Sequence, residues 1–219
     1  DGYEVILADI NGEGVAKAAA EIGALAGIEC DLGDSAQIEA MFARIAREHG
    51  VISALVNNAG IALPGDFLSY PAEDFDRVIA INLKGVFLAT QLAARAMVEH
   101  GVKGAIVNMS SINAQLAIPA IPAYCASKGG VMQITKVAAL ALAKQGIRVN
   151  AVGPGSIDTE MMAGVNANPE AFKVAMSRTP LGRPGEAGEI GDVVAVFCSS
   201  QAGYLNGAAH SVRDGRPGV

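Results

Sequence analysis

Short β-branched runs alternate with longer alanine-rich stretches along the chain. The short runs are typical of buried strands, and the longer stretches carry apolar residues at helical spacing, as in 35–49. This alternation predicts an α/β fold with a parallel sheet that helices cover on both faces. The expected strands are 4–8, 27–30, 54–57, 104–109, 147–152 and 208–212, and the expected helices are 12–22, 35–49, 72–81, 84–99, 123–143 and 186–199.

Residues 156–185 interrupt this order, because they are rich in turn residues and carry three prolines. A loop of this length inside a compact domain is usually functional. We expect it to cover the substrate as a lid, with a merely solvated connection as the alternative. Met161 and Met162 begin this segment and are candidate substrate contacts, since flexible thioethers suit a binding pocket, although a core or surface role fits them equally.

Composition indicates a compact chain without a membrane span. Of the 219 residues, 51% are hydrophobic, which is too much apolar surface for a disordered chain. The mean hydropathy is +0.35, but Gly, Pro or a charge interrupts every apolar run before the roughly 18 residues that a span requires. We therefore expect no membrane partner. A single domain over 1–219 is expected, because no repeat or linker divides the chain.

Charge and cysteine usage narrow the function further. The net charge is −6 and the 16 Lys and Arg are dispersed, which argues against a nucleic-acid partner. Cys30, Cys125 and Cys198 are odd in number and far apart, and the three histidines are isolated. Neither a disulfide framework nor a metal site is predicted. A reducing, cytoplasmic location is expected, and the polar first residues do not resemble a signal peptide.

A tyrosine–lysine pair is the sharpest chemical signal in the sequence. Tyr124 and Lys128 lie four residues apart near the start of a predicted helix, so both side chains share one face. A free tyrosine has a pKa near 10, and a nearby ammonium favours the phenolate. The pair therefore predicts a lowered tyrosine pKa and a usable proton donor and acceptor. The spacing alone is more often met by ordinary surface pairs, so the surroundings have to decide.

Those surroundings place polar residues at the ends of two strands. Ser111 follows the expected strand 104–109 and precedes Tyr124 by 13 residues, and the NNAG turn at 57–60 follows another strand. Ligand sites of open parallel sheets form at the carboxyl ends of the strands. Ser111, Tyr124 and the turn are therefore expected at one edge of the sheet.

With NLKGVF at 82–87 and PGSIDT at 154–159, these segments resemble the short-chain dehydrogenase/reductase family, and the match runs over residues 5–207. Four motifs in order at the right spacing make the resemblance specific. It implies a Rossmann-like, doubly wound parallel sheet in three α/β/α layers that binds a nicotinamide cofactor.

The resemblance implies catalytic roles for four residues. Tyr124 would exchange a proton with the substrate oxygen while a hydride moves between the substrate carbon and the nicotinamide, and Ser111 would hydrogen-bond that oxygen. Lys128 would lower the pKa of Tyr124 and bind the nicotinamide ribose. Asn82 matches the family residue that holds a water linking Lys128 to solvent, with a helix-capping or helix-breaking Asn as the alternative.

Charge at the end of the first strand bears on the choice of cofactor. Asp9 matches the family's acidic residue that takes the adenosine ribose hydroxyls, and a carboxylate there would repel the 2′-phosphate of NADP. Ile10 and Asn11 supply no arginine, so we expect NAD rather than NADP. Asp31 and Leu32 resemble the adenine-binding position, with a turn or N-cap role for Asp31 as the alternative.

Further contacts to cofactor and substrate follow from the same resemblance. The NNAG turn and the segment after the fifth strand would hold the nicotinamide half of the cofactor, and polar residues just after Ser111 are candidate substrate contacts. The expected cofactor contacts are Asn58, Ala59, Gly60, Pro154, Gly155, the backbone of Ile157 and the hydroxyl of Thr159; the candidate substrate contacts are Asn113 and Gln115, for which a turn-stabilising role is the alternative.

Two segments depart from the family pattern. The family's glycine-rich turn, T-G-x-x-x-G-x-G, is not found, and Gly12 and Gly14 follow a strand that matches the family's second. We therefore expect about 30 further residues at the start of the real protein, which intact mass would test. Their strand normally lies between those ending near Asp9 and Asn57, so two sheet halves with unpaired edges are expected. Residues 212–217 depart from the usual Asp-Gly-Gly of a segment that often contacts other subunits.

The leading expectation is an NAD-dependent oxidoreductase of secondary alcohols or ketones. Asn113 and Gln115 tilt the substrate towards sugars, polyols or other small hydroxylated molecules. One alternative is a 3-oxoacyl-[acyl-carrier-protein] reductase, which would favour NADPH; the other is a non-catalytic relative that binds nucleotide. A homo-oligomer, tetramer or dimer, is expected through the alanine-rich faces of helices 84–99 and 123–143.

Overall fold

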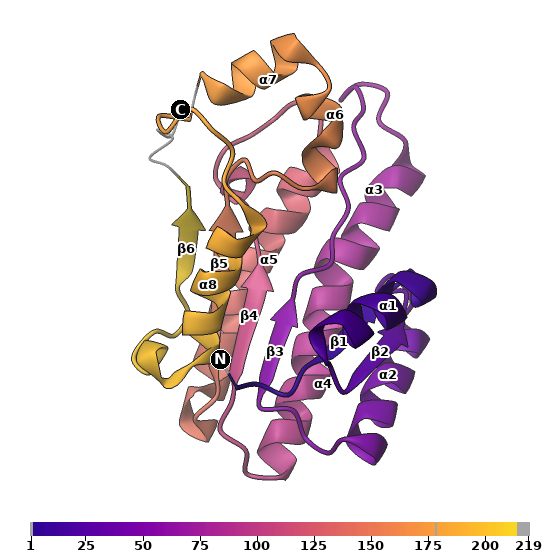
Figure 1. The fold of residues 1–219 in the computed structure, drawn as a ribbon, viewed down its shortest axis with the longest axis vertical. Helices are drawn as coiled ribbons and strands as arrows, with labels where there is room; N and C mark the ends of the chain where they lie inside the picture. The colour runs from indigo at the N-terminus through magenta and orange to yellow at the C-terminus, as the bar shows by residue number, and fades with distance from the viewer. Residues whose placement is uncertain (1, 178, 214–219) are drawn as a thin grey trace.

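The computed structural model describes residues 2–177 and 179–213, and the strands that it pairs run parallel (Figure 1). These strands consist mainly of β-branched and small apolar residues, which suit a sheet buried on both faces. They are β1 (Ile6–Asp9), β2 (Ala26–Glu29), β3 (Ala54–Asn57), β4 (Ala105–Met109), β5 (Arg148–Pro154) and β6 (Ala209–Val212).

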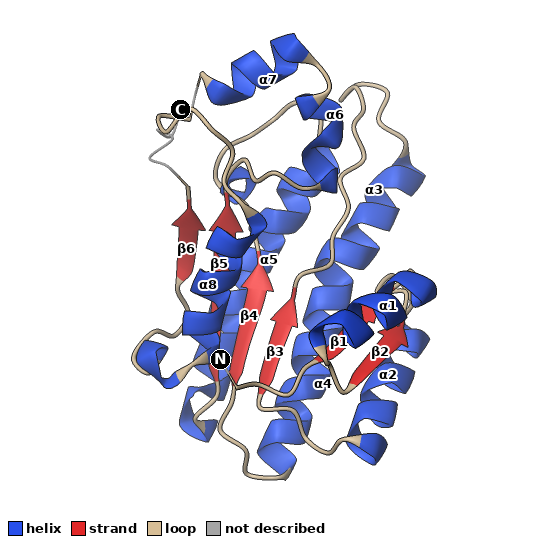
Figure 2. Cartoon of the chain, in the orientation of Figure 1, coloured by secondary structure: helices blue, strands red, loops and turns tan. Residues whose placement is uncertain are grey.

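Helices cover both faces of the sheet, which gives the expected doubly wound, three-layer arrangement (Figure 2). α1 and α8 lie on one face, and α2, α4 and α5 lie on the other. The helices are α1 (Gly12–Ile22), α2 (Ser35–Glu48), α3 (Ala72–Ile79), α4 (Val86–Glu99), α5 (Pro122–Leu142), α6 (Ala163–Asn166), α7 (Pro169–Met176) and α8 (Ala187–Cys198).

Alternate residues of β4 pack into two separate hydrophobic cores. Ile106 is fully buried against Ala93 and Met97 of α4, whereas Val107 faces the other way and packs in a cluster with Phe197 of α8. Side chains of a strand alternate between the two faces of its sheet, so a strand that is apolar throughout is buried on both. β4 is therefore an inner strand of the larger sheet, buried on both faces.

The sheet is in two pieces. β1 pairs with β2, and the other strands form a second sheet in the order β3-β4-β5-β6. Among the described residues, nothing pairs with the sides of β1 and β3 that face each other, and Val56 in β3 is 41% exposed. The two sheet halves with unpaired edges agree with the sequence, while the preceding unit stays a prediction.

One continuous helical segment replaces the two helices that we expected at 72–81 and 84–99. α3 runs into a π-helical turn, Ala80–Gly85, and then directly into α4. The expected break was wrong because Asn82 does not cap a helix and Gly85 instead packs against the carbonyl of Leu32. By length and hydropathy this segment could cross a membrane, but 44% of its most apolar window is buried inside the molecule, and core helices pass the same test.

The segment 156–185, for which a lid remains a prediction, contains helical structure that its turn-rich composition did not predict. α6 and α7 lie within it, and α7 begins where the Asn168 side chain accepts hydrogen bonds from two backbone N–H groups, with Pro169 as the first helical residue. Asn followed by Pro is a helix-start signal, so α7 was detectable in the sequence. Most of the segment 212–217 lies outside the described residues.

Candidate active site

Ser111 and Tyr124 meet at the carboxyl edge of the larger sheet. Ser111 follows β4, and its Oγ accepts a hydrogen bond from the Asn113 backbone N–H at 3.1 Å, which starts a turn of 3₁₀-helix. Tyr124 lies in the first turn of α5, which packs against that turn, and its side chain hydrogen-bonds with the Ser111 side chain. The two hydroxyls that the sequence predicts to act together are therefore in contact.

Lys128 lies one turn further along α5 and is only 3% exposed. Its Nζ donates a hydrogen bond to the Met109 carbonyl at 2.7 Å and lies 5.6 Å from the centre of the Tyr124 ring. The helical spacing of four residues predicted this proximity, but not the burial. Burial lowers the pKa of Lys128 to about 8, because an ammonium loses hydration there.

The acid–base balance of this pair differs from the expectation. Burial raises the pKa of Tyr124 above its ordinary value; the Ser111 hydrogen bond opposes this shift, and the Cys125 thiol adds to it. The predicted net lowering of the tyrosine pKa is therefore wrong for the chain on its own, because burial has the largest effect. The free-energy cost of removing the phenolate from water exceeds the stabilisation that the Ser111 hydrogen bond gives it.

Asn82 is fully buried beside this pair. Its Oδ1 accepts from the Ile61 backbone N–H at 2.9 Å, and its Nδ2 donates to the Ile61 carbonyl at 2.8 Å and to Ser127 Oγ at 3.2 Å. The π-helical turn carries this side chain, so neither of the alternative roles, capping or breaking a helix, applies. Asn82 joins the NNAG segment to α5.

Gly60 is the point at which the NNAG turn approaches the site. A Cβ on this glycine would lie 3.3 Å from Asn82 Oδ1 and 3.4 Å from Lys128 Nζ. A larger residue would press on both groups, so the glycine leaves room next to the ammonium. Of its neighbours in the turn, Asn58 is exposed and Ala59 is half-buried.

A buried polar network behind the site was missed by the sequence analysis. Asn57 Nδ2 donates to Asn108 Oδ1 at 2.8 Å and to Thr90 Oγ1 at 3.1 Å, and Asn108 Nδ2 donates to Thr135 Oγ1 at 3.0 Å. These contacts join β3, β4, α4 and α5. The available signal was one asparagine in each of two neighbouring apolar strands, because buried amides require partners.

Asp9 and Asp31 lie at the ends of β1 and β2, away from the tyrosine. Asp9 is exposed, and its Oδ1 accepts from the Asn11 backbone N–H at 2.9 Å. Asp31 Oδ1 accepts from the Gly33 backbone N–H at 2.7 Å, which is the turn role that we held as the alternative. Leu32, next to it, is half-buried.

The residues just after β5 are bonded to the far end of the segment 156–185. Ile157 forms a parallel bridge with Gly185, and the Asp158 backbone N–H donates to the Gly185 carbonyl at 2.8 Å. Pro154 and Gly155 are half-buried and Thr159 is exposed; the Thr159 hydroxyl donates to the Ile157 carbonyl at 3.4 Å. The segment 156–185 therefore starts and ends at one place.

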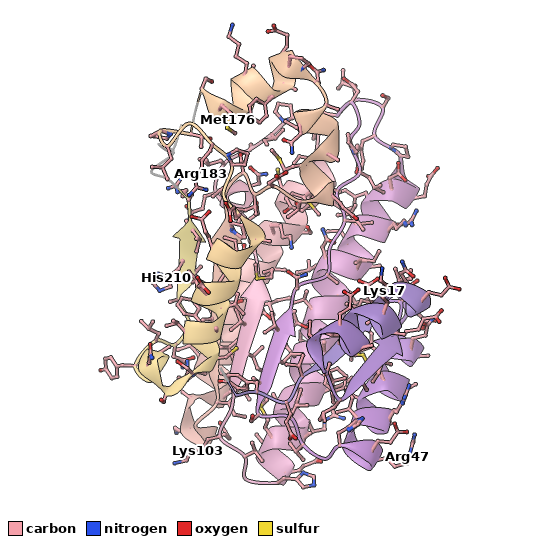
Figure 3. All side chains as sticks on the ribbon, in the orientation of Figure 1. Lys17, Arg47, Lys103, Met176, Arg183 and His210 are labelled. Carbon is pink, nitrogen blue, oxygen red and sulfur yellow. The ribbon has the colours of Figure 1, made fainter. Side chains whose placement is uncertain are left out.

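An ion pair connects the same end of the segment 156–185 to α8. The two terminal nitrogens of Arg183, which Figure 3 labels, each donate to one oxygen of Glu189 at 2.8 Å. Glu189 also accepts from the Glu186 backbone N–H at 2.7 Å and so caps α8. Both interactions hold the pKa of Glu189 down at about 2.

A cavity of ≈ 200 Å³ opens beside Ile112, the residue after Ser111. Its apolar wall includes Ile157, Leu181, Ile190 and Val212. The candidate substrate contacts are not part of this lining: Asn113 is half-buried, Gln115 and Met161 are exposed, and Met162 is half-buried. Asn113 Oδ1 is nevertheless buried with no hydrogen-bond partner among the described residues.

Known proteins are similar to this chain in sequence and in fold. A family model described as enoyl-(acyl carrier protein) reductase matches residues 1–216. The chain is 38% identical to inactive 2-(S)-hydroxypropyl-CoM dehydrogenase 2 of Xanthobacter autotrophicus, over 100% of this chain and 96% of that protein. It is also 38% identical to galactitol 2-dehydrogenase (L-tagatose-forming) of Cereibacter sphaeroides, over 98% and 85%.

Among solved structures, a gluconate 5-dehydrogenase from Burkholderia cenocepacia in complex with NADP and tartrate superposes with a TM-score of 0.91. It is 30% identical to the chain, and the match covers 98% of this chain and 85% of that one. The three proteins that this comparison and the two sequence comparisons name are all dehydrogenases, one of them described as inactive.

Proposed function

Because the chain belongs to the short-chain dehydrogenase/reductase family, we propose that it transfers a hydride between NAD(H) and the carbon of a secondary alcohol or ketone. The contact of Ser111 with Tyr124, one helical turn from a buried Lys128, carries this proposal. A buried hydroxyl pair next to an ammonium is suited to moving a proton at the edge of a parallel sheet.

In alcohol oxidation, the Tyr124 phenolate takes the proton of the substrate hydroxyl as the carbon loses its hydride, which leaves a carbonyl. The bound nicotinamide supplies or accepts that hydride. Ser111 donates a hydrogen bond to the substrate oxygen and so holds it within reach of Tyr124. In the opposite direction, Tyr124 returns its proton to the oxygen.

Lys128 has the chemistry to bind a ribose diol. Its ammonium carries three N–H donors, and within the described residues the Met109 carbonyl is the one acceptor that it meets. Two donors therefore remain for ribose hydroxyls, and Gly60 leaves the space beside Nζ open. Charged Lys128 near Tyr124 favours the phenolate, and Asn82 fixes the segment that carries Gly60 and Ile61.

Two carboxylates support a preference for NAD over NADP. Asp9 and Glu29 are paired in the register of β1 and β2, so their side chains leave the same face, and both are exposed. A 2′-phosphate beside Asp9 would meet both charges, and Ile10 and Asn11 offer no cation. The solved relative holds NADP, so the preference for NAD is proposed from these two carboxylates of the present chain alone.

A small hydroxylated molecule such as a sugar or polyol is the proposed substrate class. Asn113 Oδ1, which no donor of the described residues reaches, supports it, since a buried amide oxygen needs a donor and a substrate hydroxyl can supply one. Asn113 is also tied to Ser111 through its backbone N–H.

The test is a panel of polyols, sugars, diketones and oxoacyl thioesters with NAD(H) and NADP(H). We expect Tyr124→Phe to lose at least about 100-fold in kcat/KM, while Tyr70→Phe keeps the wild-type rate. Tyr70 is a matched control because its hydroxyl bonds the Leu63 carbonyl, at 2.8 Å, outside the site. Undiminished turnover by Tyr124→Phe would overturn the catalytic assignment.

The same panel separates the alternatives. Turnover confined to oxoacyl thioesters with NADPH would favour a 3-oxoacyl-[acyl-carrier-protein] reductase, against which Asp9 argues. Binding of NADH without turnover of any substrate would favour a non-catalytic nucleotide-binding relative.

We further propose that the protein works in the cytoplasm as a homo-oligomer, a dimer or tetramer. The side chains that support this assembly are large, apolar and exposed on two neighbouring helices. They are Phe87 (47% exposed) and Val98 (44%) on α4, and Val137 (66%) and Leu140 (82%) on α5.

A further inference from the structure

Two consecutive residues at the end of β4 hold both ends of Lys128. The carbonyl of Met109 accepts from Lys128 Nζ at 2.7 Å, and the hydroxyl of Ser110 donates to the Lys128 backbone carbonyl at 3.0 Å. Ser110 is 5% exposed and Lys128 is 3% exposed. The residues at the end of β4 thus hold Lys128 at its backbone carbonyl and at its ammonium group.

The Ser110 bond is not needed to satisfy the helix. Lys128 lies inside α5, where its carbonyl already accepts the intrahelical hydrogen bond from the residue four positions later. A carbonyl oxygen has two lone pairs, and Ser110 uses the second. The effect of this bond is therefore positional, since it fixes one point of α5 against β4.

Ser110 is itself firmly placed. Its backbone N–H donates to the Val152 carbonyl of β5 at 2.7 Å. The contact of Ser110 with Lys128 therefore connects the centre of the sheet with the helix that carries Tyr124. Ser111, the next residue, bonds the Tyr124 side chain, so neighbouring serines hold the two members of the tyrosine–lysine pair.

We propose that Ser110 is a positioning residue of the reaction, which sets the place of the Lys128 ammonium relative to Tyr124 through the Lys128 backbone. This role rests on the proposed dehydrogenase function. Among the described residues, burial alone shifts the pKa of Lys128, and Tyr124, on the same helix, is the titratable side chain in contact with it. The position of the ammonium therefore governs how strongly it favours the phenolate.

Ser110→Ala removes the positional bond and leaves the intrahelical one. We expect kcat to fall about tenfold with KM within about twofold, and the alkaline shift of the pH profile of kcat to be about one unit. Ser110→Thr keeps a hydroxyl and should restore both. Ser199→Ala is the matched control, because the Ser199 hydroxyl donates to the Val196 carbonyl at 2.8 Å, on another helix.

A second measurement does not depend on turnover. The ¹³Cε signal of Lys128 in ¹³C-lysine protein, assigned with Lys128→Met, is titrated in wild type and variants. We expect the midpoint to move towards the ordinary lysine value in Ser110→Ala, because α5 is no longer fixed against β4 at Lys128 and the ammonium becomes more accessible to water, and to stay in place in Ser199→Ala. An unchanged midpoint and pH profile in Ser110→Ala would overturn the positioning role.

The two hypotheses fail separately. If the wild type turned over nothing in the panel but the Lys128 midpoint moved in Ser110→Ala, the proposed function would fall and the hold of Ser110 on Lys128 would stand. If turnover were found and Ser110→Ala matched the wild type in both readouts, Ser110 would be only a structural residue.

Discussion

At the scale of single residues, Lys128 lowers the stability of the fold but carries a charge that the proposed reaction uses. An ammonium that is 3% exposed costs free energy to bury, and its lowered pKa of about 8 reports that cost. In the proposed function that charge acts next to Tyr124 and at the ribose hydroxyls. A residue that weakens the fold in this way belongs to the site rather than to the core.

Replacing Lys128 by Met should therefore stabilise the protein while it abolishes activity. Methionine has a similar length and no charge to bury, so we expect the melting temperature at pH 7 to rise by about 5 °C. Differential scanning calorimetry measures this rise.

The rise should depend on pH in a defined direction. Lys128 has a pKa of about 8 when folded and 10.5 when unfolded, so the unfolded chain binds the proton more tightly. The penalty is complete below pH 8 and declines as the pH rises towards 10.5. The advantage of Lys128→Met should shrink over that range, and a pH-independent advantage would contradict the burial of a charge.

Glu29 gives a prediction about the cofactor. Glu29→Gln removes one of the two carboxylates without touching Asp9, so we expect NADPH to bind several-fold more tightly and NADH to bind as before. Fluorescence titration yields both Kd values. Glu39→Gln on α2 removes an equal charge elsewhere on the surface and should change neither; an equal gain there would mean that only net charge matters.

At the scale of elements, the sequence predicted most of the fold. α1 and β3 have the expected bounds, and the other strands and most helices differ by one or two residues. These elements are apolar runs or amphipathic helices ended by Gly or Asn, which are local signals. The exceptions are the 72–99 segment and the helices α6 and α7. At Asn82 and Gly85 a tertiary contact decided the conformation, and no local pattern records it.

The candidate site shows the same division. Helical spacing predicted that Tyr124 and Lys128 are neighbours, and the family resemblance added Ser111 and Asn82. The depth at which Lys128 lies, and the raised pKa of Tyr124, follow from packing between β4 and α5. Spacing along one helix carries no information about what covers it.

Gly85 tests the π-helical turn. A Cβ at this position would collide with the Leu32 carbonyl, a backbone atom that cannot rotate away. We expect Gly85→Ala to destabilise the protein by more than about 2 kcal/mol in urea denaturation. Gly191→Ala in α8 is the control, because no atom lies within 4 Å of its Cβ, and there alanine should stabilise the helix by up to about 1 kcal/mol.

At the scale of the whole molecule, the break between β1 and β3 divides the sheet into parts of unequal protection. An edge strand bonds its neighbour through only part of its backbone N–H groups. We expect amide hydrogen exchange to be faster in the edge strands β1 and β3 than in the inner strand β4, where Ile106 and Val107 are fully buried. Equal protection of β3 and β4 would show that another strand pairs with β3.

Assembly gives a second prediction at this scale. A charge in an apolar interface is costly, so Leu140→Glu should shift the protein to a smaller species in light scattering after gel filtration. Leu68→Glu is the control, since Leu68 is 93% exposed on a different segment. A wild type that is monomeric at micromolar concentration would contradict the proposed oligomer.

The amide network behind the site has a consequence for how the strands find their alignment. A parallel sheet of apolar strands tolerates a slip of two residues, because every side chain returns to its original face. Such a slip would separate Asn57 from Asn108, and it would leave several buried donors and acceptors without hydrogen-bond partners. The side chains of Asn57, Thr90, Asn108 and Thr135 are therefore all hydrogen-bonded in only one alignment of the strands, and misaligned strands are costly during folding.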